Sequence, residues 1–125
     1  MTDALRKMEE EYKEVLNAVE RGEESAKTKL AWYKLSGMGG AKVDVDGAVK
    51  LLEERVKDRD GEAMWMLGLC KEYGRGIEQD ISGAERLYEQ SKAFGNDVGK
   101  ILSRNVGDRK QRIELKGLWN VEQHY

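Results

Sequence analysis

An internal repeat of helix hairpins constrains the fold of this chain more than any other feature of its sequence. Residues 63–95 read as an apolar helical pattern, a glycine-rich turn before Asp80 and a second helical pattern. The same order of residues occurs once more upstream, at offsets of 37 residues before the turn and 36 after it. The ten identities pair Ala26 with Ala63, Leu30 with Leu67, Lys34 with Lys71, Gly37 with Gly74, Gly39 with Gly76, Asp44 with Asp80, Gly47 with Gly83, Ala48 with Ala84, Leu51 with Leu87 and Glu53 with Glu89. A period of this length predicts a helical solenoid, in which each hairpin packs its remaining apolar face on its neighbour.

The second copy carries the clearer local signals. Small or apolar residues at Ala63, Leu67, Cys70 and Gly74 lie on one face of the first helix, and Gly74 and Gly76 are expected to end that helix. Ser82 followed by Glu85 fits a capping box and predicts the start of the second helix, whose buried stripe would be Ala84, Leu87, Tyr88 and Ser91. In the first copy Asp44 or Asp46 is the expected N-cap.

The two copies resemble the Sel-one-like repeats, a family related to the tetratricopeptide repeats. The residues that follow the family pattern closely are Ala63, Leu67, Gly68, Gly74, Gly76, Ile77, Asp80, Ala84, Tyr88 and Ser91, and those that follow it loosely are Ala26, Leu30, Gly37, Gly39, Asp44, Ala48 and Leu51. Lys34 and Lys71 stand where the family has tyrosine, Ala31 stands where it has glycine, and residues 39–43 lengthen the first turn. The resemblance implies an all-α fold, a short right-handed α-solenoid, with an adaptor or scaffold role. The tetratricopeptide family is the structural runner-up.

The chain divides into five expected parts. An amphipathic capping helix in residues 1–23, with an apolar stripe from Leu5 to Val19, precedes repeat one (24–60) and repeat two (61–96). Residues 97–106 look like half of a third repeat that caps the C-terminal end. Residues 107–125 fit a strand or a helix about equally well.

Composition argues against several classes of function. Of the 125 residues, 39% are hydrophobic and 37% are charged. With one cysteine, and with His124 next to the C-terminus as the one histidine, the sequence offers no zinc-ligand set and no cysteine–histidine pair held by a fold. Cys70 is expected to be an inert packed thiol. We expect no catalytic residue, no metal and no cofactor. The net charge of -2 does not indicate a nucleic-acid partner, and no apolar run is long enough to cross a membrane, so a cytoplasmic location is expected.

The candidate binding residues lie on the first helix of each repeat. On a helical wheel Trp65, Leu69 and Glu72 point away from Ala63 and Leu67, as Thr28, Trp32 and Leu35 do in repeat one. The two tryptophans either fill the space between repeats or line a concave groove that binds a peptide or helix. Lys34 and Lys71 would then stand at the groove edge and favour an acidic protein or peptide. The predicted site is therefore Trp32, Lys34, Leu35, Trp65, Leu69, Lys71 and Glu72.

A second reading treats the chain as a structural or regulatory segment. The N-terminal helix is acidic, and the stretch from Lys100 to Lys116 carries a local excess of four positive charges. These opposite ends allow the chain to self-associate as a homo-oligomer, or to pack against the rest of a larger polypeptide. The basic stretch could also contact an acidic partner or RNA, or simply be solvated.

Overall fold

The computed structural model describes residues 2–104, 106 and 109, and all regular structure in those residues is helical. The elements are α1 (Asp3–Glu20), α2 (Ala26–Ser36), the short 3-10 helix η1 (Met38–Gly40), α3 (Val45–Lys57), α4 (Gly61–Tyr73) and α5 (Ile81–Ala93). Residues 97–104 are helical as well. The predicted all-α class is therefore confirmed. The prediction for residues 107–125 lies outside the described residues, apart from Arg109.

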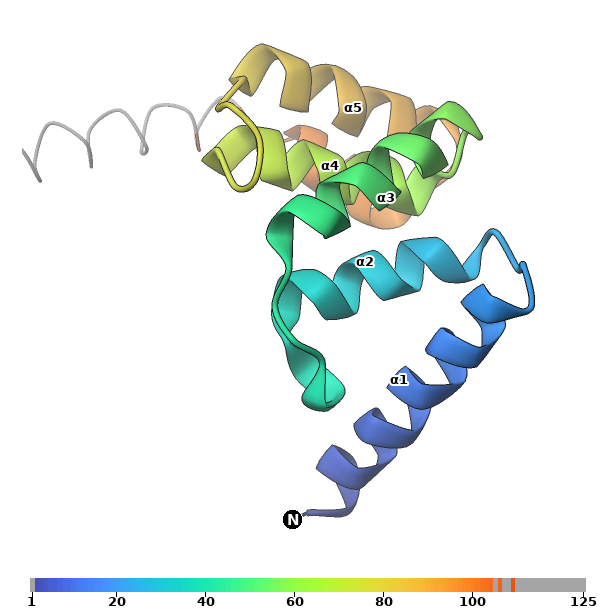
Figure 1. Ribbon diagram of the computed structural model, residues 1–125. Helices are drawn as coiled ribbons and strands as arrows, with labels where there is room; N and C mark the ends of the chain where they lie inside the picture. The colour runs from blue at the N-terminus through green and yellow to red at the C-terminus, as the bar shows by residue number, and fades with distance from the viewer. Residues whose placement is uncertain (1, 105, 107–108, 110–125) are drawn as a thin grey trace, which may run out of the picture.

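The helices form two hairpins that stack on each other (Figure 1). Helices α2 and α3 make the first hairpin and α4 and α5 the second, with α3 packed on α4 between them. Helix α1 runs diagonally away from this stack and meets α2 and η1. This arrangement leaves α2 and α4, the first helices of the two hairpins, next to each other.

The turns of the two hairpins repeat the same hydrogen bonds. The amide of Asp44 donates to the carbonyl of Lys34 at 2.9 Å, and that of Asp80 donates to Lys71 at 2.8 Å. Each aspartate then caps the next helix, accepting from the amide of Gly47 at 3.0 Å or of Gly83 at 2.8 Å. These are the N-caps that satisfy free amides in the first helical turn. The expected capping box at Ser82 is wrong, because Asp80 takes that role and Ser82 lies inside the first turn.

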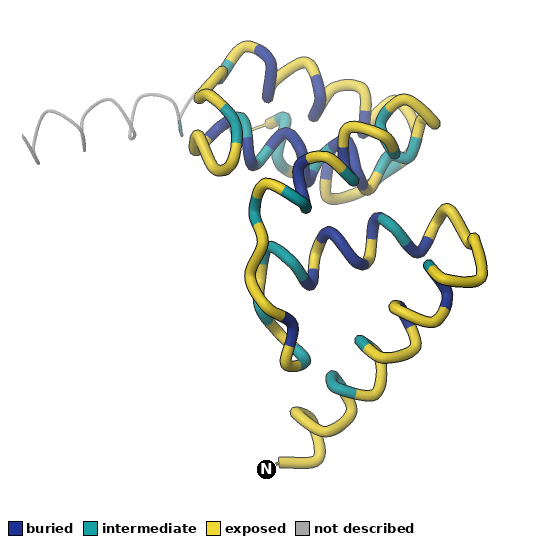
Figure 2. Tube along the Cα trace, in the orientation of Figure 1, coloured by how far each residue is buried: buried dark blue, intermediate teal, exposed yellow. Residues whose placement is uncertain are grey.

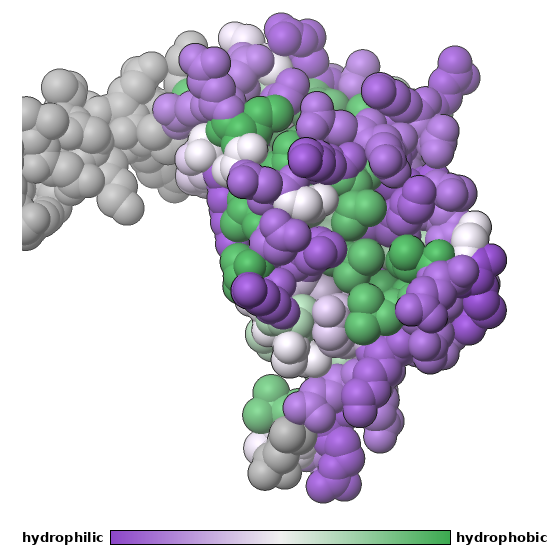
Figure 3. All heavy atoms as spheres, in the orientation of Figure 1, coloured by the Kyte–Doolittle hydropathy of each residue, from purple (hydrophilic) through white to green (hydrophobic). Residues whose placement is uncertain are grey.

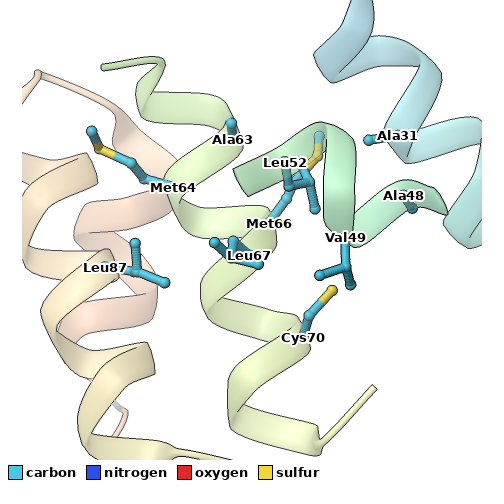
Figure 4. Close-up of a cluster of buried hydrophobic side chains, with 10 residues drawn as sticks. All are labelled: Ala31, Ala48, Val49, Leu52, Ala63, Met64, Met66, Leu67, Cys70 and Leu87. Carbon is cyan, nitrogen blue, oxygen red and sulfur yellow. The ribbon is translucent and has the colours of Figure 1, made fainter. Parts of the chain in front are cut away.

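The core lies where the four helices of the two hairpins converge. Figure 4 shows Ala31 of α2, Ala48, Val49 and Leu52 of α3, Ala63, Met64, Met66, Leu67 and Cys70 of α4, and Leu87 of α5 in one cluster. The predicted stripes are buried at Ala63, Leu67 and Cys70 on α4 and at Ala84, Leu87, Tyr88 and Ser91 on α5. Gly74 is the exception, because it is the C-cap of α4 and is exposed. Burial raises the pKa of the Cys70 thiol, in keeping with an inert packed side chain.

Ala31 in the first repeat stands where the second repeat has Gly68, and the residue that packs on this position also differs between the repeats. A Cβ atom added to Gly68 would lie 2.5 Å from Cε1 of Tyr88, so glycine is what lets this ring pack against α4. In the first repeat the equivalent positions hold Ala31 and Leu52, both fully buried. A smaller side chain on α3 thus accompanies the larger residue on α2, which keeps the packed volume similar in both repeats.

Helix α1 packs against η1, which lies in the lengthened first turn. A Cβ atom added to Gly39 would lie 2.8 Å from the carbonyl oxygen of Met8, so the two backbones are in close contact there. Burial along α1 is nevertheless limited to Val15 and Ala18, and the N-terminal half of the helix is largely exposed in Figure 2. The predicted apolar stripe is therefore too long: Leu5 is 49% exposed, because α1 diverges from α2 beyond the η1 contact.

Polar contacts tie one hairpin to the next. The hydroxyl of Thr28, which is buried, donates to Asp60 Oδ2 at 2.6 Å, and Asp60 caps α4 through the amide of Glu62 at 3.0 Å. Arg55 Nη2 lies 3.4 Å from the same Asp60 oxygen. Thr28, expected to face the groove, thus belongs to the interface between repeats instead.

No helix within the described ranges is both long enough and apolar enough to cross a membrane.

Candidate binding groove

Two adjoining hollows lie along α2 and α4, and they share Trp32, Trp65 and Met66. The apolar hollow, about 390 Å³, extends toward the C-terminal ends of the two helices and is further lined by Leu35, Ser36, Leu69, Cys70, Tyr73 and Arg75. The acidic hollow, about 560 Å³, extends toward α1 and is further lined by Glu11, Glu14, Val15, Lys29, Tyr33 and Glu62. We call the combined surface the Trp groove.

The two tryptophans differ in how firmly they are packed. Trp65 is half-buried and contacts two separate core clusters, one around Leu67 and one around Tyr88. Trp32 is 36% exposed, and its ring meets Tyr33 edge-on at a centroid distance of 4.9 Å. Both explanations of the tryptophans therefore apply in part, since Trp65 fills space between helices and Trp32 presents its ring to the groove.

The apolar hollow is held in shape by a contact between the repeats. Arg75, just after α4, donates from Nη2 to the carbonyl oxygen of Leu35 at 2.6 Å. This bond satisfies a carbonyl at the end of α2 and fixes the two helix ends side by side. Leu35 and Leu69 are half-buried in the hollow, so two of the predicted residues lie together with the tryptophans.

The acidic hollow carries three carboxylates and one ammonium group. Glu14 is paired with Arg21 at 2.9 Å, whereas Glu11 and Glu62 make no salt bridge in the part of the chain that the structure describes. Partial burial and the negative charge of Asp60 raise the pKa of Glu62, and Lys29 counteracts this in part. The charge bordering the tryptophans is therefore mainly negative.

The two predicted lysines do not border the Trp groove. Lys34 Nζ lies 3.3 Å from Oδ2 of Asp44, in the turn of its own hairpin. Lys71 lines a separate shallow hollow with Ile77, Glu78, Gln79 and Asp80. The structure thus does not bring either lysine to the tryptophans, so these lysines do not favour an acidic ligand in the Trp groove.

Glu72 was predicted to face the groove, but the structure buries it completely. Its Oε1 accepts a hydrogen bond from Tyr88 Oη at 2.8 Å, and its Oε2 lies 2.7 Å from Nε of Arg109. Burial alone would raise the pKa of Glu72, but the bonds from Arg109 and Tyr88 outweigh it and hold the pKa below its ordinary value. This side chain joins α4 to the C-terminal end of the described structure.

Several groove residues lie outside the predicted set. Lys29 and Glu62 stand three residues before Trp32 and Trp65, so helical periodicity could have placed them on the same face. Glu11 and Glu14 could not be found in this way, because their position depends on the angle between α1 and α2. Among residues 2–104, 106 and 109, no group of three metal-ligating side chains is close enough to hold an ion.

Comparison with known proteins shows what this geometry is similar to. No family model matches the chain. A curated mouse protein, the DAP3-binding cell death enhancer 1 of Mus musculus, is 30% identical over 80 residues, which is 64% of this chain and 13% of the mouse protein. The crystal structure of a Sel1 repeat protein from Oxalobacter formigenes superimposes with a TM-score of 0.67 and 27% identity, covering 76% of this chain and 39% of that one. This chain therefore spans less than half the length of either protein. The predicted α-solenoid is confirmed, and the chain has the fold of a Sel1-like repeat protein.

Proposed function

We propose that this chain is a protein-interaction module that binds a peptide or helix of a partner protein in the Trp groove. The observation that carries the proposal is the exposure of Trp32 beside Leu35 and Leu69 in a hollow between the first helices of the two repeats. Large aromatic side chains in such hollows supply much of the binding energy in protein interfaces. The name of the mouse relative records that it binds another protein, DAP3, which supports a protein as the class of ligand.

The side chain best suited to test this proposal is Trp32. Trp65 packs on two core clusters, so its removal would also cost stability. Trp32 belongs to neither cluster, and its replacement by alanine is expected to leave the helical fold intact. Phe94, which is 54% exposed and lies just after α5, offers a control of similar size outside the groove.

The experiment is affinity capture from lysate of the source cells with the wild type, Trp32→Ala and Phe94→Ala, each first checked by circular dichroism. A protein that binds the wild type and Phe94→Ala but not Trp32→Ala, and that binds again after purification, would support the groove. Equal capture by all three proteins would place any binding surface elsewhere and contradict the proposal. Purified DAP3 is a defined partner to include beside the lysate.

A further inference from the structure

The charges around Trp32 and Trp65 restrict which kind of ligand the Trp groove can bind. The acidic hollow places Glu11 and Glu14 of α1 opposite Glu62 of α4, with Lys29 as the cation among its lining residues. Arg21 already neutralises Glu14 at 2.9 Å. Glu11 and Glu62 remain as carboxylates without a salt bridge in the described chain, and both face the hollow that holds the tryptophans.

These carboxylates stand beside two indole rings. The face of an indole ring attracts a cation through its quadrupole, by about 0.5–1 kcal/mol at exposed sites and more where water is excluded. A carboxylate within reach of the same cation adds a favourable charge pair. Tyr33 provides a third ring in the hollow, with Tyr12 packed on it at a centroid distance of 5.1 Å.

The opposite end of the groove has a different chemistry. The apolar hollow is lined by Leu35, Leu69 and Cys70 between the same two tryptophans. Its one cationic lining residue, Arg75, already donates to the carbonyl oxygen of Leu35 at 2.6 Å. The groove therefore has a negative end toward α1 and an apolar end away from it, joined by Trp32, Trp65 and Met66.

The hydrophilic side chains of α1 continue the negative end. Figure 3 shows hydrophilic residues along the visible face of α1, below a hydrophobic patch at the level of α2 and α3. Acidic residues dominate α1, with Asp3, Glu9, Glu10, Glu11, Glu14 and Glu20 against Arg6, Lys7 and Lys13 in the helix. A positively charged ligand would thus be attracted toward this end before contact.

We propose that the ligand of the Trp groove is a basic segment of a partner protein, in which an arginine or lysine adjoins a large apolar side chain. The basic side chain lies in the acidic hollow against Trp32, Glu11 and Glu62, and the apolar side chain fills the hollow between Leu35 and Leu69. This inference rests on the proposed function, and it names the chemistry of the partner. It replaces the acidic ligand expected from Lys34 and Lys71.

The test starts from a library of random peptides displayed on phage and selected on the wild-type chain. Peptides that bind are synthesised, and their affinities are measured by fluorescence anisotropy. The variants are Glu11→Gln with Glu62→Gln, the single Glu11→Gln, Trp32→Ala, and a control with Glu53→Gln and Glu89→Gln. Glu53 and Glu89 are exposed on α3 and α5, outside the groove, so both double variants remove two negative charges.

The expected selection is rich in arginine or lysine next to leucine or an aromatic residue. The groove double variant should bind these peptides about tenfold more weakly, the single variant should fall between, and the control should bind like the wild type. The loss should shrink as salt is raised, because exposed charge pairs are screened. Replacing the basic residue of the peptide by glutamine should remove most of the difference between wild type and variant.

Other outcomes separate this inference from the proposed function. Neutral or acidic peptides that still require Trp32 would overturn the basic ligand and leave the groove as the binding site. A selection that yields no peptide, or only peptides indifferent to Trp32→Ala, would contradict both. Sedimentation that shows the wild type as a dimer and the Glu11→Gln, Glu62→Gln variant as a monomer would assign the groove to a second copy and overturn the partner segment.

Discussion

Nε of Arg109 lies 2.7 Å from Oε2 of the fully buried Glu72, and the guanidinium also stands 5.5 Å from the centre of the Tyr88 ring. Arg109 Nη2 donates further to the carbonyl oxygen of Leu102 at 2.7 Å. One side chain thus connects α4, α5 and the helical residues 97–104. In a solenoid, such a segment covers the face of a repeat on which no neighbouring repeat packs.

Breaking this pair should cost more stability than any surface ion pair in the described chain. Arg109→Gln leaves the Glu72 carboxylate buried with Tyr88 as a remaining donor, and the expected loss in the free energy of unfolding is about 3 kcal/mol. Glu72→Gln should show a similar loss, and the double variant should lose less than the two single losses combined. Urea denaturation followed by circular dichroism measures all three. Additive losses would show that the two residues act independently.

The same pair predicts how stability depends on pH. The pKa of Glu72 lies below its ordinary value in the folded chain, so folding favours the ionised carboxylate. Its contribution is therefore complete above about pH 4.3, the ordinary value for glutamate, and is lost as the pH falls through the depressed pKa of the folded state. We expect the wild type to lose stability relative to Glu72→Gln as the pH falls through this range. Glu85→Gln, on an exposed side chain, is the control. Parallel pH profiles for wild type and Glu72→Gln would be inconsistent with this linkage.

The contact between Gly68 and Tyr88 predicts an unusual response to alanine. Alanine normally stabilises a helix relative to glycine by about 1 kcal/mol. At Gly68 the new Cβ would lie 2.5 Å from a ring that is fully buried and held by its hydroxyl on Glu72, so the ring cannot swing away. We expect Gly68→Ala to destabilise the fold by about 1–3 kcal/mol.

Gly61 supplies the matched control for this substitution in the same helix. A Cβ added there has its nearest neighbour at 3.5 Å, which is an ordinary contact. Thermal unfolding of Gly61→Ala should therefore be close to that of the wild type. If Gly68→Ala unfolds at the same temperature as Gly61→Ala, the close approach of Tyr88 to α4 does not constrain this position.

The repeat pattern predicted much of the fold because it records local requirements. Asp44, Gly37 and Gly74 each act within one turn, and the structure places them as caps at the predicted helix ends. The buried stripes follow from helical periodicity in the same way. The prediction for Ser82 is wrong because Asp80 and Ser82 both stand near the start of α5, and a sequence does not show which oxygen reaches the free amides.

The groove was harder to predict because its lining depends on the angles between helices. Glu72 and Leu69 are neighbours on a helical wheel. Glu72 is nevertheless buried and paired with Arg109, whereas Leu69 lines the apolar hollow. Arg109 is 37 residues away in the sequence, and nothing local to Glu72 indicates it. The acidic residues of α1 lie near the tryptophans because α1 packs against both η1 and α2.

One of the turns that follow α1, α3 and α5 holds a non-glycine residue in the left-handed backbone conformation. Gly22, Arg59 and Gly95 stand at equivalent positions after α1, α3 and α5, with φ of 86°, 64° and 81°. An arginine in this left-handed region costs about 1–2 kcal/mol relative to glycine, while glycine makes the unfolded chain more flexible by about 0.4–1 kcal/mol. We therefore expect Arg59→Gly to stabilise the chain by about 0.5 kcal/mol and Arg59→Ala, which keeps the strain, to give no gain. Urea denaturation of both variants isolates the backbone effect from loss of the side chain. Equal stability of the two variants would mean that the left-handed conformation at Arg59 carries no strain.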